Sequence, residues 1–223
     1  MPMTTPNAAN EDGPVATVLP AAREPSRADE AHHRIANSLQ LLSAMVSVEA
    51  RGIEDPAALA ALDMTQRRIG AIASVHRQLY RSHETSMVDL GSYLEELGAD
   101  LEASYANAAA GRRVLVHPSP IAVAPEEATA IGIIVSELVG NACKYAYAPG
   151  QPGDVRIALH PMLFGGYMLE VEDRGRGFTV GGPAPGTGLG GRLIEMMAAR
   201  LGGWHGYDDA RPGTRFALFV GRR

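Results

Sequence analysis

The chain has 223 residues, of which 46% are hydrophobic and 20% charged, and its formal net charge is −5. This composition fits a soluble globular protein with room for one large or two small domains, and it lacks the basic excess of nucleic-acid binders. No apolar run is long enough to span a membrane, and residues 1–6 do not begin a secretory signal. The single cysteine, Cys143, cannot form an internal disulfide and is expected to pack, so we expect a cytoplasmic protein.

Residues 1–26 are rich in proline, alanine, threonine and acidic residues and show no apolar periodicity. Such a segment buries too little surface to offset its chain entropy. We therefore expect a disordered tail over residues 1–26.

An antiparallel helical hairpin is predicted next, over residues 27–84. Between residues 28 and 51 apolar residues recur at three- and four-residue steps, as in an amphipathic helix. Asp55 can cap and Pro56 can open a second helix of the same kind. Each stripe is wider than one hairpin buries, which favours a homodimeric four-helix bundle. The stripe residues are Ile35, Leu39, Leu42, Met45, Val46 and Val48, then Leu59, Leu62, Ile69, Ile72, Val75 and Leu79.

The pattern changes after residues 81–86, and residues 85–223 are expected to form a second domain. Helix-like and strand-like segments alternate there, which predicts an α+β fold in which helices and a sheet form an α/β sandwich. The expected helices are residues 88–106, 125–147 and 193–201, and the expected strands are residues 113–117, 155–159, 167–172 and 214–220. Trp204 lies outside these elements and is expected to pack near Gly202 and Gly203.

Three polar residues of the expected helix 125–147 share one face. Glu137, Asn141 and Lys144 stand at i, i+4 and i+7, and Tyr145 flanks them. Alone, such a stripe is typical of a solvated helix face. Close to the glycine clusters that follow, it can hold Mg²⁺ through oxygens of Asn141 and Glu137 while Lys144 meets a phosphate.

Two glycine-rich boxes follow this helix in the sequence. Asp173 ends an apolar strand, where its carboxylate can accept a hydrogen bond from the amino group of adenine. The glycines that follow let the base approach the backbone closely. The second box leads into a helix whose N-terminal N–H groups suit phosphate oxygens. Residues 181–185 between the boxes are expected to form a short mobile lid. The box residues are Gly175 and Gly177, then Gly186, Thr187, Gly188, Leu189 and Gly190.

These motifs resemble the GHKL superfamily of ATP-binding domains, which includes histidine kinases, gyrase-type ATPases and anti-sigma-factor kinases. The resemblance covers roughly residues 86–223. It implies that Asp173 binds adenine, that Asn141 coordinates Mg²⁺ and that the second glycine box contacts phosphate.

The first helix contains His32-His33-Arg34-Ile35-Ala36-Asn37, which resembles the His-Arg-x-x-Asn acceptor motif of one subfamily of bacterial sensor histidine kinases. The resemblance implies that His33 is the phosphoacceptor and that Asn37 belongs to its motif; His32 is the competing candidate. A neutral imidazole nitrogen can attack phosphorus near neutral pH. Arg34 stands where many histidine kinases have an acidic residue, so Glu137 is one candidate for the base.

The resemblance implies a homodimeric histidine kinase that uses ATP and Mg²⁺ and passes the phosphoryl group from His33 to an aspartate of a separate response regulator. Two other functions stay open: a phosphotransfer protein that only relays phosphate, and a serine kinase or partner switch of the anti-sigma type. The tail is too short for a sensory domain. We therefore expect a separate sensory partner, control by expression, or a longer parent protein, and Met1 favours the first two.

Overall fold

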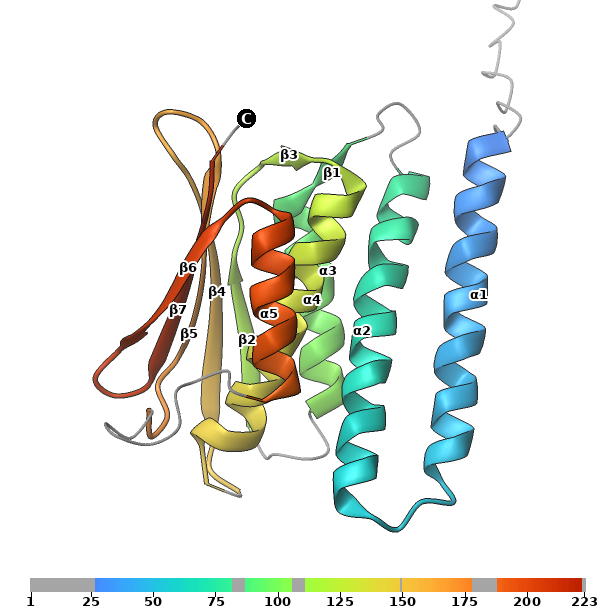
Figure 1. The fold of residues 1–223 in the computed structure, drawn as a ribbon, viewed down its shortest axis with the longest axis horizontal. Coiled ribbons are helices and arrows are strands. Elements are labelled where there is room, and N and C mark those ends of the chain that lie inside the picture. Colours follow the sequence, from blue (N-terminus) through green and yellow to red (C-terminus); the bar gives the residue numbers. More distant parts are fainter. Residues whose placement is uncertain (1–26, 82–86, 106–110, 149, 178–187, 222–223) are drawn as a thin grey trace, which may run out of the picture.

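The chain folds in the predicted order, with a pair of helices first and a mixed domain after it. The computed structural model describes residues 27–81, 87–105, 111–148, 150–177 and 188–221. The α+β class is confirmed (Figure 1). The elements are α1 (Arg27–Ala50), α2 (Pro56–Arg81), β1 (Val88–Asp89), α3 (Leu90–Tyr105), β2 (Arg112–His117), β3 (Ala122–Val123), α4 (Pro125–Asn141), η1 (Ala142–Ala146), β4 (Gly153–Pro161), β5 (Tyr167–Asp173), α5 (Leu189–Arg200), β6 (Trp204–Asp209) and β7 (Thr214–Val220).

The main sheet has the strand order β2-β4-β5-β7-β6. The β2–β4 pair is parallel and the other neighbours are antiparallel, while β1 and β3 form a separate small sheet. Burial alternates along β5: Tyr167, Leu169, Val171 and Asp173 are buried, and the residues between them are more exposed. This alternation is typical of a sheet covered on one face. Asp173 therefore lies on the covered face, in register with the apolar core.

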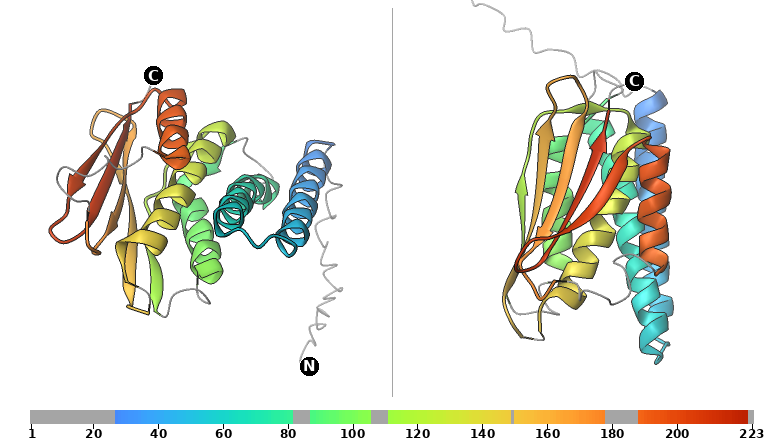
Figure 2. Two further views of the ribbon diagram at one scale, coloured as in Figure 1. Left: turned by 60° about the horizontal axis from the view of Figure 1, so that its bottom comes forward. Right: turned by 60° about the vertical axis from the view of Figure 1, so that its left-hand side comes forward.

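Helices α3, α4 and α5 cover that face of the sheet, and the hairpin lies outside them (Figures 1 and 2). Helix α2 packs on α4, and α1 packs along α2 at the greatest distance from the sheet. Within the described residues, no helix is both long and apolar enough to cross a lipid bilayer.

The turn between α1 and α2 follows the predicted chemistry. The Asp55 carboxylate accepts a hydrogen bond from the Ala57 backbone N–H at 3.0 Å, and Pro56 is the first residue of α2. Proline suits this position because its nitrogen has no hydrogen to leave unpaired.

The expected helix 125–147 is wrong in its last turn. Helix α4 ends at Asn141, and residues Ala142–Ala146 form a π-helical turn. Such turns recur at functional sites. Here the turn presents the Ala146 carbonyl to the Arg176 N–H, at 2.8 Å.

Strand β6 was missed, and the expectation for Trp204 is wrong. The segment carries Gly206 and two aspartates, which have low strand propensity, so its pairing with β7 is not visible locally. Trp204 begins this edge strand and is 69% exposed. It stacks on Phe219 at 5.5 Å between ring centroids, which covers only part of the indole.

Candidate functional site

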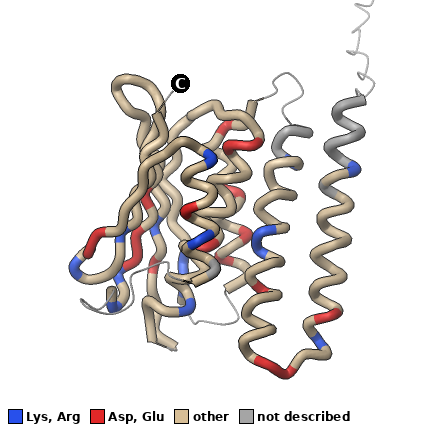
Figure 3. Tube along the Cα trace, viewed as in Figure 1, with Lys and Arg blue, Asp and Glu red and all other residues tan. Residues whose placement is uncertain are grey.

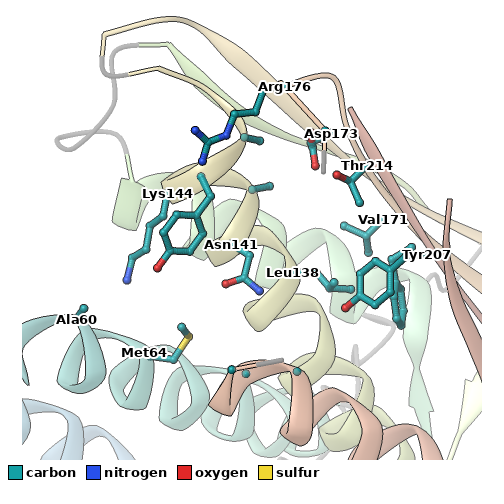
Figure 4. Close-up of a pocket in the computed structure, with 18 of the residues that line it drawn as sticks. Ala60, Met64, Leu138, Asn141, Lys144, Val171, Asp173, Arg176, Tyr207 and Thr214 are labelled. Atoms are coloured by element: carbon teal, nitrogen blue, oxygen red, sulfur yellow. The ribbon is translucent and has the colours of Figure 1, made fainter. Parts of the chain in front are cut away.

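A cavity of about 580 Å³ lies where the sheet, α4, the start of α5 and α2 meet. Its apolar walls come from Leu138, Val171, Tyr207 and Phe216, and Figure 4 shows Asp173 and Thr214 on the sheet side with Asn141 on α4. An apolar cavity with a few converging polar groups is the usual form of a small-molecule site.

Asp173 is the polar group at the sheet end of the cavity. It is 8% exposed and accepts a hydrogen bond from the Gly175 N–H at 2.9 Å. Burial raises the pKa of this carboxyl, although hydrogen bonds from Gly175 and Thr214 act in the opposite direction. A buried carboxylate facing an apolar cavity can accept a hydrogen bond from a bound heterocyclic amine.

Close backbone approaches around Asp173 explain the glycines of the first box. A Cβ on Gly175 would lie 2.1 Å from the Ala146 carbonyl oxygen. A Cβ on Gly213, whose φ is +109°, would lie 1.9 Å from the Asp173 carbonyl oxygen. Gly177 lines the cavity with φ +65°. A larger residue at Gly175 would push the Asp173 loop away from the turn Ala142–Ala146, and one at Gly213 would clash with Asp173 itself.

Asn141 and Lys144 line the cavity from the end of α4 and the π-helical turn, and Tyr145 lines it while 59% exposed. Figure 4 shows Asn141 deeper along α4 than Lys144. The Lys144 ammonium lies 3.2 Å from an oxygen of Asp63, which belongs to α2. In this arrangement Lys144 is therefore held by the hairpin.

Glu137, one turn before Asn141, is completely buried, so the polar face of α4 is not a solvated one. Its Oε1 accepts a hydrogen bond from Arg68 Nε at 2.7 Å, and its Oε2 has no hydrogen-bond partner among the residues that the structure describes. A Cβ on Gly190 would lie 2.6 Å from Oε2, so the start of α5 packs against this carboxylate.

The second glycine box lies at the N-terminus of α5. Gly188, Gly190 and Gly191 line the cavity, and no side chain in the described part of the chain caps the helix. The helix begins at Leu189 rather than near Leu193, which brings its N–H groups to the cavity. Gly186, Thr187 and residues 181–185 lie outside the described residues, as does the side chain of Leu189.

His33 and Asn37 are not brought to this cavity. Both lie in α1, and α2 separates α1 from the ATPase-like half of the molecule (Figures 1 and 2). Asn37 is exposed, and the side chains of His32 and His33 are outside the part of the chain that the structure describes. Glu137 consequently does not face His33 in this arrangement.

The sequence analysis did not foresee that α2 forms one wall of the cavity. Arg68 pairs with Glu137 across 69 positions of sequence, and local periodicity carries no signal for such a contact. The sequence analysis also assigned no role to Thr214, which lines the cavity near Asp173, or to Arg176, which lies between the two glycines of the first box. The lining residues from α2 are Ala60, Ala61, Met64, Thr65 and Arg68.

Together these features suit a nucleotide. A buried acceptor and apolar walls can hold a base, and open N–H groups at the start of α5 can hold phosphates. Asn141 and Glu137 supply oxygen atoms between these two ends, the ligand type that Mg²⁺ prefers.

Two family models match the chain. The first, described as histidine kinase, matches residues 30–105. The second, described as histidine kinase-, DNA gyrase B- and HSP90-like ATPase, matches residues 126–222. The first match covers the hairpin and continues through α3, and the second covers the chain from α4 to β7.

Curated relatives agree with these models. Blue-light-activated histidine kinase 2 of Erythrobacter litoralis is 28% identical over 184 residues, which are 78% of this chain and 50% of the relative. Sensor histidine kinase PdtaS of Mycobacterium tuberculosis is 28% identical over 202 residues, which are 87% of this chain and 39% of the relative. The chain thus spans half or less of the length of these relatives.

The fold is shared with a solved structure. The histidine kinase domain from the Erythrobacter litoralis EL346 blue-light activated histidine kinase superposes with a TM-score of 0.65 at 20% identity. The superposition covers 88% of this chain and 95% of that domain. The pairing of a helical hairpin with a GHKL-type sandwich is therefore confirmed as a fold.

Proposed function

Because this chain belongs to the bacterial sensor histidine kinases, with a GHKL-type ATP-binding domain, we propose that it phosphorylates His33 from ATP and Mg²⁺. The phosphoryl group then passes to an aspartate of a separate response regulator. The observation that carries the proposal is the cavity, which gathers Asp173, Asn141 and the start of α5 from three distant parts of the sequence.

Each of these groups has a role in binding ATP. Asp173 accepts a hydrogen bond from the adenine amino group, and the N–H groups at the start of α5 donate hydrogen bonds to phosphate oxygens. Lys144 adds a positive charge once it leaves Asp63. Transfer of a phosphoryl group depends mainly on such positioning and on charge neutralisation.

Mg²⁺ fits the same end of the cavity. Asn141 lines it, and Oε2 of Glu137, which has no hydrogen-bond partner within the described ranges, is a buried carboxylate oxygen next to it. These two residues would hold the ion, which when bound neutralises charge on the phosphates.

Transfer to His33 of the same chain requires the hairpin to move. Helix α2 stands between the cavity and α1, so the acceptor helix cannot meet the nucleotide while α2 packs on α4. Glu137 as the base for His33 has the same requirement. For transfer within one chain, the docked arrangement is thus a state before transfer.

The decisive experiment is incubation with γ-labelled ATP, with and without Mg²⁺. A Mg²⁺-dependent label that is labile in acid and stable in base is expected, because phosphohistidine has this stability. An acid-stable label would instead support a serine kinase of the anti-sigma type. Absence of both label and ATP binding would support a phosphate relay.

We also propose that the kinase is a homodimer joined through α1. Leu41 is 63%, Met45 56% and Val48 62% exposed on a helix whose other side packs on α2. Such an apolar stripe is costly to leave in water, and a second copy presents the same stripe, as four-helix bundles require.

The double substitution Leu41→Glu and Met45→Glu is expected to convert the dimer to a monomer. Two unpaired carboxylates in an apolar interface cost several kcal/mol, which weakens association by at least about 100-fold. Light scattering after size exclusion measures the mass. Leu163→Glu, at a 99% exposed position in the β4–β5 turn, is the matched control and should remain dimeric. A monomeric wild-type chain would contradict the dimer.

A further inference from the structure

Arg68 is a cation that the helical hairpin inserts into the cavity of the other domain. It lies in α2, lines the cavity, and donates from Nε to Oε1 of Glu137 at 2.7 Å. Its side chain is 21% exposed, whereas that of Glu137 is fully buried. Basic residues of α2 lie on the side that faces α4 (Figure 3).

The position of Arg68 is at the phosphate end of the cavity. Its partner Glu137 touches the start of α5, where Gly190 approaches Oε2 too closely to carry a Cβ. Asn141, one turn along α4, lines the same region, while Asp173 and Thr214 lie at the sheet end (Figure 4). A nucleotide whose base meets Asp173 therefore directs its outer phosphate toward α2.

We propose that Arg68 is a ligand of the γ-phosphate of ATP, supplied to the nucleotide site by the hairpin, and that it exchanges Glu137 for this phosphate when ATP binds. The inference rests on the proposed ATP-dependent function. A guanidinium presents a planar fork of N–H donors that matches a phosphate as well as a carboxylate. The exchange replaces one anionic partner by another, so the buried cation is never left unpaired.

Because of this exchange, the contact between the hairpin and the cavity would change when ATP binds but not when ADP binds. ADP lacks the γ-phosphate and leaves Arg68 on Glu137. ATP draws Arg68 away from Glu137 and frees that carboxylate beside Asn141. Another ion pair between the domains, Asp63 with Lys144, also involves a residue suited to phosphate binding.

The test is the affinity of the full chain for ATP and for ADP, each with Mg²⁺, measured by calorimetry. Arg68→Ala is expected to weaken ATP binding at least tenfold, about 1.4 kcal/mol, and to change ADP binding less than about threefold, since ADP lacks the atoms that Arg68 contacts. Arg68→Lys should lose part of the ATP affinity, because it keeps charge but not the fork. Arg77→Ala is the control: Arg77 lies in the same helix and pairs with Asp100 outside the cavity.

Arg68→Ala leaves Glu137 buried without its cation, which could disturb the fold. The double variant Arg68→Ala with Glu137→Gln removes that charge. It should lack the preference for ATP that Glu137→Gln alone, which loses the same carboxylate, retains. Equal losses for both nucleotides, or none, would overturn the role of Arg68. A wild-type chain that binds neither nucleotide would overturn the proposed kinase function itself.

Discussion

Replacing His33 by glutamine is expected to abolish the acid-labile phosphoryl label while leaving ATP binding intact. Glutamine keeps a polar side chain of similar length but offers no nitrogen lone pair that can attack phosphorus. Loss of a nucleophile commonly lowers turnover by several orders of magnitude, so we expect a decrease of at least about 1,000-fold. Incubation with γ-labelled ATP measures the phosphoryl label, and calorimetry measures the affinity for ATP.

His32→Gln is the matched control for this experiment, because it changes the neighbouring imidazole in the same helix. It should keep most of the label. If His32→Gln removes the label and His33→Gln does not, the acceptor is His32. ATP affinity should not change in either variant, since α2 separates α1 from the cavity.

Asp173→Asn is expected to weaken ATP binding roughly 100-fold, because hydrogen bonds to charged groups contribute about 1.5–3 kcal/mol. The amide keeps one oxygen that can accept from the Gly175 N–H, but its other polar group is an NH₂ donor. This donor cannot accept a hydrogen bond from the adenine amino group. The preference for ATP over GTP should fall at the same time. Competition with a fluorescent nucleotide measures both affinities.

Glu172→Gln is the control that tests whether the weaker ATP binding of Asp173→Asn results from the lost contact in the cavity. Glu172 is the preceding residue of β5, faces the opposite side of the sheet and pairs with Arg215 at 2.8 Å. The Glu172→Gln substitution should alter ATP affinity by no more than about threefold, because this ion pair lies on the face of the sheet away from the cavity. A similar loss in both variants would mean that Asp173→Asn acts through the stability of the sheet.

Much of the fold was predictable because each element carries its own period. The alternation along β5 places Asp173 on the covered face, and the turn at Asp55 and Pro56 fixes the hairpin. The glycine boxes were informative for a related reason. Backbone approaches such as that of Gly175 to Ala146 leave no room for a side chain, so the requirement is visible in the sequence.

The remaining features depend on contacts between distant segments. The π-helical turn after Asn141 is set by its packing against the loop at Gly175, not by residues 142–146 alone. Helix α2 forms a wall of the cavity because it packs on α4. From the local sequence alone, Arg67 and Arg68 are typical of the solvated edge of an amphipathic helix. The packing of one helix on another in this way produces no periodicity or motif that could be recognised in the sequence of either segment.

The wall formed by α2 also bears on the design of inhibitors. Ala60 and Met64 line the same cavity as Asn141, but they belong to a helix that has to move for phosphoryl transfer to His33 of the same chain. A compound that fills the cavity against Ala60 and Met64 would bind only the docked arrangement and would hold it closed. Its selectivity would come from the hairpin, which is a surface that GHKL enzymes without such a helix do not offer.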